Sequence, residues 1–480
     1  MTDRLTTPVG VQGTLTAGAE IERVGIPIRV NLFKFVFLYA AITAGWLEVT
    51  SPSHTWLNWY LSIAWSLYLP VAGMGFCRIF VKEFMGVEVL ARSDYKGFVS
   101  KKIVIVIPTV CRYDTIPALR RVINSVVEYA PRNLTVWRAD VIVDEGSEAL
   151  VQLQTFVAEF EHVRIIVVPR EFTTPRGTHA KARANQYALE IRRVEGDNNG
   201  QTYVYHLDDD THIETDTASS IAEFVQLHHG TYYLAQGILT FPHELSPSFL
   251  CRLADSIRPA DDITRCGLFT GDLHTPLEGL HGEHMLVRAD IEERVGWDFG
   301  DALVEDAYFA LRFSEMYPGK STALRSFTYG ASPRNLWDFI KQRRRWAAGL
   351  LRLVCTQNEF SATTKLPLAY AVFCWMAGPF QFVLVVLLLA WLTATGNTSP
   401  VEQWIIFAWT FNLAFSLWQY MEGLKINMLV SKQKSSIFWL SLAMIPLIYL
   451  FTIFEGFAAL CGLVKFMRGN LAFEVIRKEV

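Results

Sequence analysis

The chain lacks the glycine-rich fingerprints with which many proteins hold nucleotides. No GxxxxGK[ST] motif occurs, and the only short glycine-rich run, Gly73-Met74-Gly75, lies inside an apolar stretch. A P-loop and a dinucleotide-binding fingerprint are therefore excluded, because both need glycines where a strand turns into a helix. Any diphosphate that this protein binds would have to be held by basic side chains and a metal ion instead.

Paired cysteines and an excess of one charge are also missing. The seven cysteines form no CxxC pair and have no histidine at metal-ligand spacing, so we expect them to be reduced and structural. The formal net charge is −3, which gives no indication of nucleic-acid binding. The sequence also has no internal repeat and no low-complexity segment.

Charged residues are scarce, and apolar residues are concentrated in five stretches. Only 19% of the 480 residues are charged, whereas 51% are hydrophobic. Five runs approach the roughly 20 apolar residues that a membrane helix needs: Leu32–Val49, Leu57–Cys77, Leu368–Leu392, Trp404–Met421 and Ile437–Leu463. The segment before the first run is largely polar and no small-residue cleavage site follows it, so a cleaved signal peptide is not expected.

These runs predict a division of the chain into five parts. They are an N-terminal segment (1–31), two transmembrane helices (32–77), a large domain (78–365), about three transmembrane helices (366–463) and a tail (464–480). Basic residues favour the cytoplasmic side of a membrane. Arg23, Arg29 and Lys34 flank the first run, and Arg78 and Lys82 follow the second, so we expect the large domain in the cytoplasm. The tail is a conflict, because five spans place it outside although it is basic.

The large domain alternates between predicted strands and helices. Ile103–Ile107 is a continuous β-branched run, which is typical of a central parallel strand. The segments that follow are, in order, a helix over Ile116–Tyr129, strands over Ala139–Val143 and Val163–Val168, a helix over His179–Val194 and a strand over 202–207. This alternation predicts an α/β domain with a mostly parallel sheet, in which ligands bind at the carboxyl ends of the strands.

Two acidic clusters stand at such strand ends. Asp144 and Glu145 follow the second predicted strand, and Asp208, Asp209 and Asp210 follow the fourth. One explanation is turn and helix-cap chemistry, because aspartate favours both positions. The other is a divalent cation such as Mg²⁺ or Mn²⁺, which takes oxygen ligands and often shares a phosphate. Their common position at strand ends favours the cation.

Two later segments carry further polar candidates. In the predicted helix Asp301–Glu315, the pair Glu305 and Asp306 lies in the first or second turn. The pair is either a solvated face near the helix dipole or a site in which Asp306 acts as a general base. The polar segment around Gly282 supplies three side chains that could line a substrate, whereas a metal cluster is not expected from them: His281, Glu283 and His284.

The predicted helix before the third apolar run is basic and amphipathic. Gln342, Arg345 and Trp346 stand at i, i+3 and i+4, on one helical face. A guanidinium binds phosphate oxygens in a forked geometry, and an indole can stack on a sugar ring. Arg343 and Arg344 point elsewhere, and anchoring to anionic lipid at the membrane surface is the alternative for them.

The order and spacing of these groups resemble the membrane-embedded family-2 glycosyltransferases, the class of cellulose, chitin and hyaluronan synthases. Four segments most resemble the Egghead-type β-1,4-mannosyltransferases: residues 144–147 (DEGS), 181–184 (KARA), 304–306 (VED) and 342–346 (QRRRW). The resemblance covers about residues 100–355 and implies a GT-A-like domain inserted between about five transmembrane helices, with interfacial amphipathic helices. Val304 departs from the Thr that many polymer synthases carry, which weakens an assignment to them.

The resemblance also implies roles for the candidate residues. Asp306, beside Glu305, removes a proton from the acceptor hydroxyl, while Arg345 stabilises the leaving diphosphate. Asp208 and Asp210 hold Mg²⁺ or Mn²⁺, with Asp210 the more direct ligand. The residues implied to bind the nucleotide-sugar are Thr109, Asp144, Glu145, Lys181, Asp208, Gln342 and Arg345. Those implied to bind the acceptor are Trp346, Glu283 and His284.

We therefore predict an inverting, metal-dependent hexosyltransferase in a multi-pass membrane protein, with its catalytic domain in the cytoplasm at the plasma membrane or an endomembrane. The expected partners are a nucleotide-sugar donor (GDP-mannose favoured, a UDP-sugar possible), a lipid-linked or glycan acceptor and membrane lipid, but not nucleic acid. One alternative is a processive polysaccharide synthase that uses a UDP-sugar and translocates its polymer. Another is a membrane transporter or scaffold that only binds nucleotide; transporters carry charges inside their spans, and here only Glu455 clearly lies within one.

Overall fold

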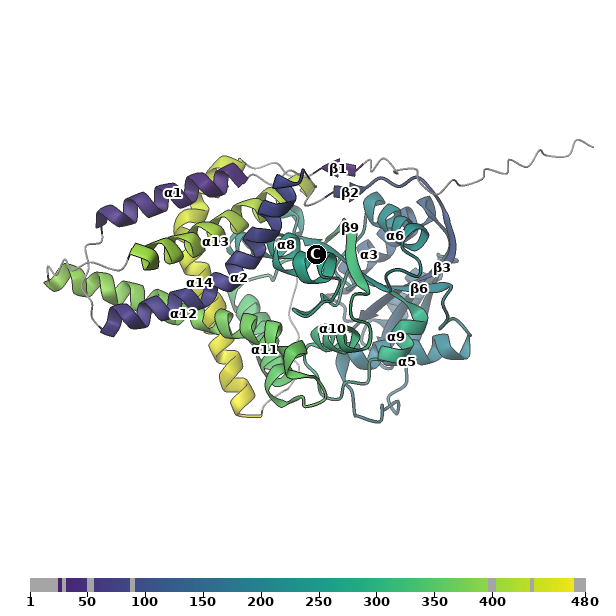
Figure 1. Cartoon of the computed structure of the whole chain (residues 1–480). Helices are drawn as coiled ribbons and strands as arrows, with labels where there is room; N and C mark the ends of the chain where they lie inside the picture. Colours follow the sequence, from purple (N-terminus) through teal and green to yellow (C-terminus); the bar gives the residue numbers. More distant parts are fainter. Residues whose placement is uncertain are drawn as a thin grey trace, which may run out of the picture.

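Two parts of the molecule lie side by side (Figure 1): a mixed α/β part and a group of long helices from both ends of the chain. The computed structural model describes residues 25–27, 32–49, 56–86, 91–395, 403–431 and 436–469. Short helices and the helix α11 (Leu336–Thr356) lie between the two parts.

The α/β part is built on a seven-stranded sheet in the order β5-β4-β3-β6-β8-β7-β9. Its strands are β3 (Val99–Thr109), β4 (Leu134–Asp144), β5 (Val163–Val168), β6 (Thr202–His206), β7 (Leu234–Thr240), β8 (Met285–Arg288) and β9 (Ser321–Tyr329). The first four strands pair in parallel, whereas β8 runs antiparallel to both of its neighbours. The predicted α/β fold and its mostly parallel strands are confirmed, and the carboxyl ends of β3, β4 and β6 lie at one edge.

Helices cover both faces of this sheet because its strands are apolar on both sides. Ile103, Ile105 and Ile107 of β3 pack into one hydrophobic cluster, whereas the alternate residues Val104 and Val106 pack into another. The first cluster includes residues of α3 (Ile116–Tyr129), α4 (Leu150–Val157) and α6 (Thr215–Leu227). The second includes residues of α5 (Ala180–Val194), α9 (Ala289–Val295) and α10 (Glu305–Met316).

Several small elements complete this part. A two-stranded sheet pairs β1 (Gly25–Pro27) with β2 (Ala91–Ser93). Short helical turns are η1 (Ala130–Arg132), η2 (His243–Leu245), α7 (Phe249–Ala254), α8 (Ile257–Ile263) and the π-helical η3 (Gly267–Asp272). Helix α11 starts where the Asn335 side chain accepts a hydrogen bond from the Asp338 backbone N–H at 2.9 Å, which is an N-cap.

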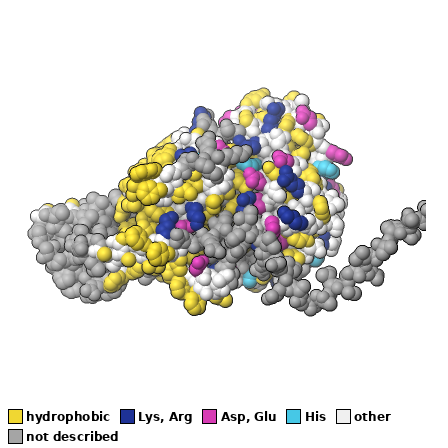
Figure 2. Space-filling model, turned by 90° about the horizontal axis from the view of Figure 1, so that it is seen from above, with side chains coloured by type: hydrophobic (Ala, Val, Ile, Leu, Met, Phe, Trp, Pro, Cys, Tyr) yellow, Lys and Arg dark blue, Asp and Glu magenta, His cyan; other side chains and the backbone are white. Residues whose placement is uncertain are grey.

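All five predicted apolar runs fall on helices of the second part. These are α1 (Leu32–Val49), α2 (Trp56–Phe84), α12 (Ala362–Thr395), α13 (Gln403–Val430) and α14 (Ile437–Met467). Hydrophobic side chains dominate the visible surface of this part, whereas charged side chains are more frequent on the α/β part (Figure 2). Within the described residues, α14 is the one helix long and apolar enough to cross a membrane. The five spans and their orientation therefore stay a prediction.

Candidate active site

A cavity of about 740 Å³ lies between the carboxyl edge of the sheet and the long helices. Side chains from far-apart segments line it, and all of the predicted site residues except Glu145 and His284 are among them. Those residues are Thr109, Asp144, Lys181, Asp208, Asp210, Glu283, Glu305, Asp306, Gln342, Arg345 and Trp346. Residues of α12, α13 and α14 extend the wall between the long helices: Trp375, Gln419, Tyr420, Tyr449 and Glu455 are examples.

Thr109 and Asp144 lie at the sheet end of the cavity, each as the last residue of its strand. The Thr109 hydroxyl donates to the Asp209 carboxylate at 2.6 Å, which orients that side chain. The Asp144 carboxylate accepts from the Arg183 guanidinium at 2.6 Å, yet its side chain stays 60% exposed. The Asp144 carboxylate is therefore both ion-paired and accessible at this edge of the sheet.

Lys181 lies where the acidic groups of the cavity meet. Its ammonium donates to the Asp208 carboxylate and, at 2.6 Å, to the Gly282 carbonyl oxygen, and it lies 4.0 Å from Glu305. Burial alone would lower the pKa of Lys181, but the negative charges of Asp208, Glu305 and Asp306 outweigh burial and raise it. The side chain is therefore a fixed cation between two acidic groups.

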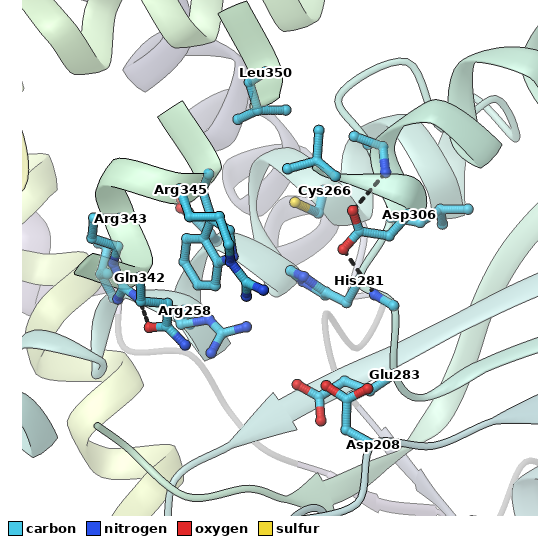
Figure 3. A pocket seen from close by; sticks show the side chains of 18 of the residues that line it. Asp208, Arg258, Cys266, His281, Glu283, Asp306, Gln342, Arg343, Arg345 and Leu350 are labelled. Carbon is cyan, nitrogen blue, oxygen red and sulfur yellow. Dashed lines mark hydrogen bonds between the residues drawn. The ribbon is translucent and has the colours of Figure 1, made fainter. Parts of the chain in front are cut away.

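The first acidic group consists of Asp208, Asp210 and Glu283. One carboxylate oxygen from each lies within 4.8 Å of the others, and Figure 3 shows Asp208 and Glu283 next to each other. Glu283 is buried and accepts a hydrogen bond from the Thr211 hydroxyl. Three carboxylates at this spacing match the hard oxygen donors that Mg²⁺ and Mn²⁺ prefer. Glu283, expected at the acceptor, thus lies with the cation-binding candidates.

The second acidic group is the pair Glu305 and Asp306 at the start of α10. Asp306 accepts from the Gly282 backbone N–H at 3.1 Å, which fixes its carboxylate toward the cavity. Burial raises the pKa of Glu305 to about 7; the charge of Asp306 adds to the rise, while Lys181 and Arg345 oppose it. The Glu305 carboxyl therefore holds its proton to a higher pH than an exposed glutamate does.

The segment 281–284 connects the two acidic groups, and Gln236 holds it in place. The Gln236 amide donates to the carbonyl oxygens of Glu283 and His284, both at 3.0 Å, and its oxygen accepts from the His281 N–H at 3.0 Å. Sequence reasoning did not find Gln236, because a lone glutamine in a strand carries no motif.

Asp262 is a second residue that sequence reasoning missed. Its carboxylate lies 2.6 Å from Nε2 of His281, which faces the cavity opposite Arg258 and Arg345 (Figure 3). Burial opposes the charged imidazole, but the Asp262 charge outweighs it and raises the pKa of His281. Asp262, Cys266 and His281 also bring one ligand atom each to within 4.8 Å of one another. The adjacent acids Asp261 and Asp262 were the one feature of the sequence that could have indicated this residue.

Helix α11 supplies the wall of the cavity that faces Asp306. Gln342, Arg345 and Trp346 all line it, as their shared helical face predicts. Guanidinium groups of Arg258 and Arg343 lie over the Trp346 ring, at 5.2 and 4.4 Å from its centroid. The indole is therefore held by cation–π contacts within the wall.

Three expectations need correction. His284 is fully buried, with Nδ1 2.7 Å from the Tyr205 hydroxyl and Nε2 2.9 Å from the Ser326 carbonyl oxygen, so it cannot reach an acceptor. Glu145 does not line the cavity, because its carboxylate accepts from the Arg170 backbone N–H at 3.1 Å. Arg343 was expected to point away from the face of Gln342, with lipid anchoring as its alternative, but its side chain is 2% exposed, lines the cavity and pairs with buried Asp255 and half-buried Glu455.

Comparisons with known proteins identify the family. The sequence profile of the family described as "Glycosyl transferase family group 2" matches residues 203–454, more than half of the chain. The chain belongs to this family. This membership confirms the predicted resemblance to family-2 glycosyltransferases. The seven-stranded sheet agrees with the predicted GT-A-like α/β domain.

Two curated relatives narrow the resemblance to the Egghead type. "Beta-1,4-mannosyltransferase egh" of Drosophila melanogaster is 30% identical over 274 residues, which cover 56% of this chain and 56% of that protein. "Beta-1,4-mannosyltransferase bre-3" of Caenorhabditis elegans is 30% identical over 230 residues, 47% of this chain and 49% of the relative. The matched region thus spans about half the length of each relative.

A solved structure is similar at a lower level. The mannosyltransferase PcManGT from Pyrobaculum calidifontis, in complex with GDP-Man and Mn²⁺, has a TM-score of 0.49 and 13% identity. The similarity covers 86% of this chain and 99% of that one. At this level of similarity, no ligand of the Pyrobaculum protein is carried over to this chain.

Proposed function

We propose that this family-2 glycosyltransferase forms a β-1,4-mannosyl bond, with GDP-mannose as donor and a lipid-linked or glycan sugar at the membrane as acceptor. The names of both curated relatives support the sugar and the linkage. The observation that carries the proposal is that the first acidic group, Lys181, Asp306 and Arg345 all line the same cavity. A sugar nucleotide needs such a combination of carboxylates for a cation and cations for its diphosphate.

In this proposal Asp306 is the general base. It accepts the proton of the acceptor hydroxyl while that oxygen bonds to the anomeric carbon of the donor, whose bond to the diphosphate oxygen breaks. The Gly282 N–H that Asp306 accepts at 3.1 Å orients its carboxylate for this task. One base and one direction of attack give a single displacement with inversion, so an α-linked donor yields a β product.

Arg345 and Lys181 act on the leaving group. Both are cations that line the cavity, and a diphosphate that leaves the sugar gains negative charge which they stabilise. Asp208, Asp210 and Glu283 would hold a divalent cation, which when bound neutralises charge on the diphosphate as a Lewis acid. Lys181 contacts Asp208, so it fixes the position of the first acidic group relative to Asp306.

The acceptor end of the cavity is proposed to lie between α11 and the long helices. Trp346 of α11 and aromatic residues of α12 to α14, such as Trp375, Tyr420 and Tyr449, line that end. Aromatic faces suit the apolar faces of a sugar ring, and a position beside α14 suits an acceptor presented at a membrane. The catalytic domain would then lie at the cytoplasmic surface of a multi-pass membrane protein.

The extension of the cavity between α13 and α14 also favours a second candidate, a processive polysaccharide synthase with a UDP-sugar donor. Such an enzyme needs a polar path for its product between membrane helices, and Gln419, Thr452 and Glu455 line the cavity there.

A donor and acceptor screen tests both candidates. Detergent-purified protein with Mn²⁺ would be incubated with GDP-mannose, UDP-glucose or UDP-N-acetylglucosamine, and with octyl glucoside, octyl mannoside or octyl galactoside as acceptor. We expect transfer from GDP-mannose alone, with one β-1,4-linked mannose in the product. Transfer from a UDP-sugar into long products would instead support the synthase, and turnover without any glycoside product would contradict the transferase.

A further inference from the structure

A carboxylate in an apolar helix is costly unless it has a partner, and Glu455 of α14 has two in other helices. Its carboxylate accepts from Nε of Arg343 in α11 at 3.0 Å and from the indole N–H of Trp375 in α12 at 3.1 Å. All three side chains line the cavity. Glu455 thus ties two helices to the one helix of the described part that is suited to cross a membrane.

Arg343 is buried between two carboxylates. Besides Glu455, it pairs with Asp255 of the short segment after α7 at 2.5 Å, and the Asp255 side chain is fully buried. Removing either acid would leave a buried cation only partly compensated, a change to which buried ion pairs are sensitive. The position of the guanidinium is therefore set jointly by α14 and by the α7–α8 segment.

The same guanidinium touches two side chains that line the cavity. It donates to the Gln342 amide oxygen and lies 4.4 Å above the centroid of the Trp346 ring. On its other side it lies 4.2 Å from the centroid of Phe339, so its plane is confined by two aromatic rings. A shift of Arg343 would therefore move or loosen Trp346 and Gln342.

Close packing of α11 on α14 surrounds this ionic contact. A Cβ atom at Gly462 of α14 would lie 2.6 Å from Cβ of Ala347 and 2.8 Å from the carbonyl oxygen of Arg344, both in α11. The two backbones approach so closely only because residue 462 is a glycine. Backbone packing and the Arg343–Glu455 pair thus fix the same stretch of α11.

We propose that Glu455 and Arg343 are positioning residues, which hold Trp346 at the acceptor end of the cavity, with Gln342 beside it, and so couple acceptor binding to the packing of α11 on α14. The coupling between α11 and α14 is argued from the contacts alone, whereas its effect on acceptor binding rests on the proposed function. The first acidic group belongs to the loop after β6 and to segment 281–284, not to α11 or α14.

The test compares Glu455→Gln with Glu422→Gln. Glu422 is a matched control, because it is a buried carboxylate of the neighbouring helix α13 that pairs with Lys34 and Lys425 but does not line the cavity. Hydrogen exchange would be measured on the whole chain in detergent. We expect faster exchange of the α11 amides around residues 342–350 in Glu455→Gln, unchanged exchange in the sheet, and no change in α11 in Glu422→Gln.

Kinetics of the same variants supply the second arm. With the octyl glycoside that the wild type uses best, we expect Glu455→Gln to raise the acceptor KM roughly tenfold, in the range of coupling within one salt-bridge network. The affinity for GDP-mannose with Mn²⁺ should change less than the acceptor KM, because the first acidic group lies outside α11. Glu455→Asp should recover part of the loss because it keeps the charge. Unchanged α11 exchange in Glu455→Gln, or an equal effect in Glu422→Gln, would overturn the proposal. If the wild type transfers no mannose, the proposed function fails, yet the exchange result still decides this inference.

Discussion

Asp306 is the residue on which the proposed chemistry depends most directly. Its carboxylate faces the cavity, held by the Gly282 N–H at 3.1 Å, and lies at the start of a helix whose first turn also carries Glu305. The sequence predicted this pair, because a Glu-Asp dipeptide at the start of a predicted helix can be recognised from the sequence alone. The hydrogen bond that orients it is not visible, because Gly282 is more than twenty residues away.

Replacing Asp306 by Asn should abolish transfer and spare donor binding. The amide keeps an oxygen that can accept the Gly282 N–H but cannot take a proton, and a positioned general base contributes roughly 10²–10⁴-fold to rate. Initial rates and equilibrium binding of GDP-mannose would be measured side by side. Asp301→Asn is the control, because Asp301 pairs with Arg352 outside the cavity. Joint loss of binding and transfer would show that Asp306 is structural.

Glu305 should make stability depend on pH. Its pKa is raised from 4.5 to about 7, so the folded state holds this proton more tightly than the unfolded state. Stability from this group is therefore present below pH 4.5 and lost as pH rises through about 7, by up to about 3 kcal/mol at 1.36 kcal/mol per pKa unit. Glu305→Gln mimics the protonated form, so its Tm relative to the wild type should increase between pH 5 and pH 8 in the presence of chelator. A difference that stays flat across this range would refute the raised pKa.

Residues were placed correctly where helical spacing fixed the direction of their side chains. They were placed less well where they were chosen only because they lie in a polar segment. Gln342, Arg345 and Trp346 share one helical face, so their spacing was enough to place them together. Glu283 and His284 are adjacent, yet one faces the cavity and the other is buried. His284 has a left-handed backbone with φ of 56°, which turns the chain between the two side chains. No sequence pattern signals that turn.

At the scale of elements, segment 281–284 matters more than any one strand. It accepts from Lys181, donates to Asp306 and places Glu283 beside Asp208. The strands β3 to β6 and the helices α3, α5, α10 and α11 were predicted from periodicity, which is strong in long elements. The strands β7, β8 and β9 and the short helices around the cavity were not predicted. β8 has only four residues, and neither β7 nor β9 has the continuous β-branched run that marked β3.

Gly282→Ala should therefore reduce transfer without unfolding the protein. A Cβ atom there would lie 2.7 Å from Nζ of Lys181 and 3.5 Å from Asp306. The flexible end of Lys181 can move aside, but it then loses its contact with the Gly282 oxygen. We expect a roughly tenfold loss of rate, about the worth of one charge-assisted hydrogen bond. Gly200→Ala is the control, since a Cβ there would meet nothing within 4 Å. Equal rates in both variants would show that the segment does not set the geometry.

At the scale of the whole molecule, residues from every region of the α/β part meet beside a bundle of long helices. The five apolar runs in the sequence located those helices, but composition alone does not decide which of them cross a membrane; among the described residues only α14 has the required length and apolarity. The cavity between the parts was not predictable either, because its walls come from segments more than two hundred residues apart. Only the order of the motifs, together with the family resemblance, predicted that their residues meet in one site.

The convergence of Asp208, Asp210 and Glu283 on a cation-bound sugar nucleotide is tested most directly by donor binding. Purified wild type and Asp210→Ala would be titrated with GDP-mannose at a series of Mn²⁺ concentrations and in chelator, with binding followed by calorimetry. We expect tight binding by the wild type only when Mn²⁺ is present, and weak binding by Asp210→Ala that Mn²⁺ does not improve. Equal affinity of the wild type with Mn²⁺ and in chelator would contradict a metal-assisted site at these carboxylates.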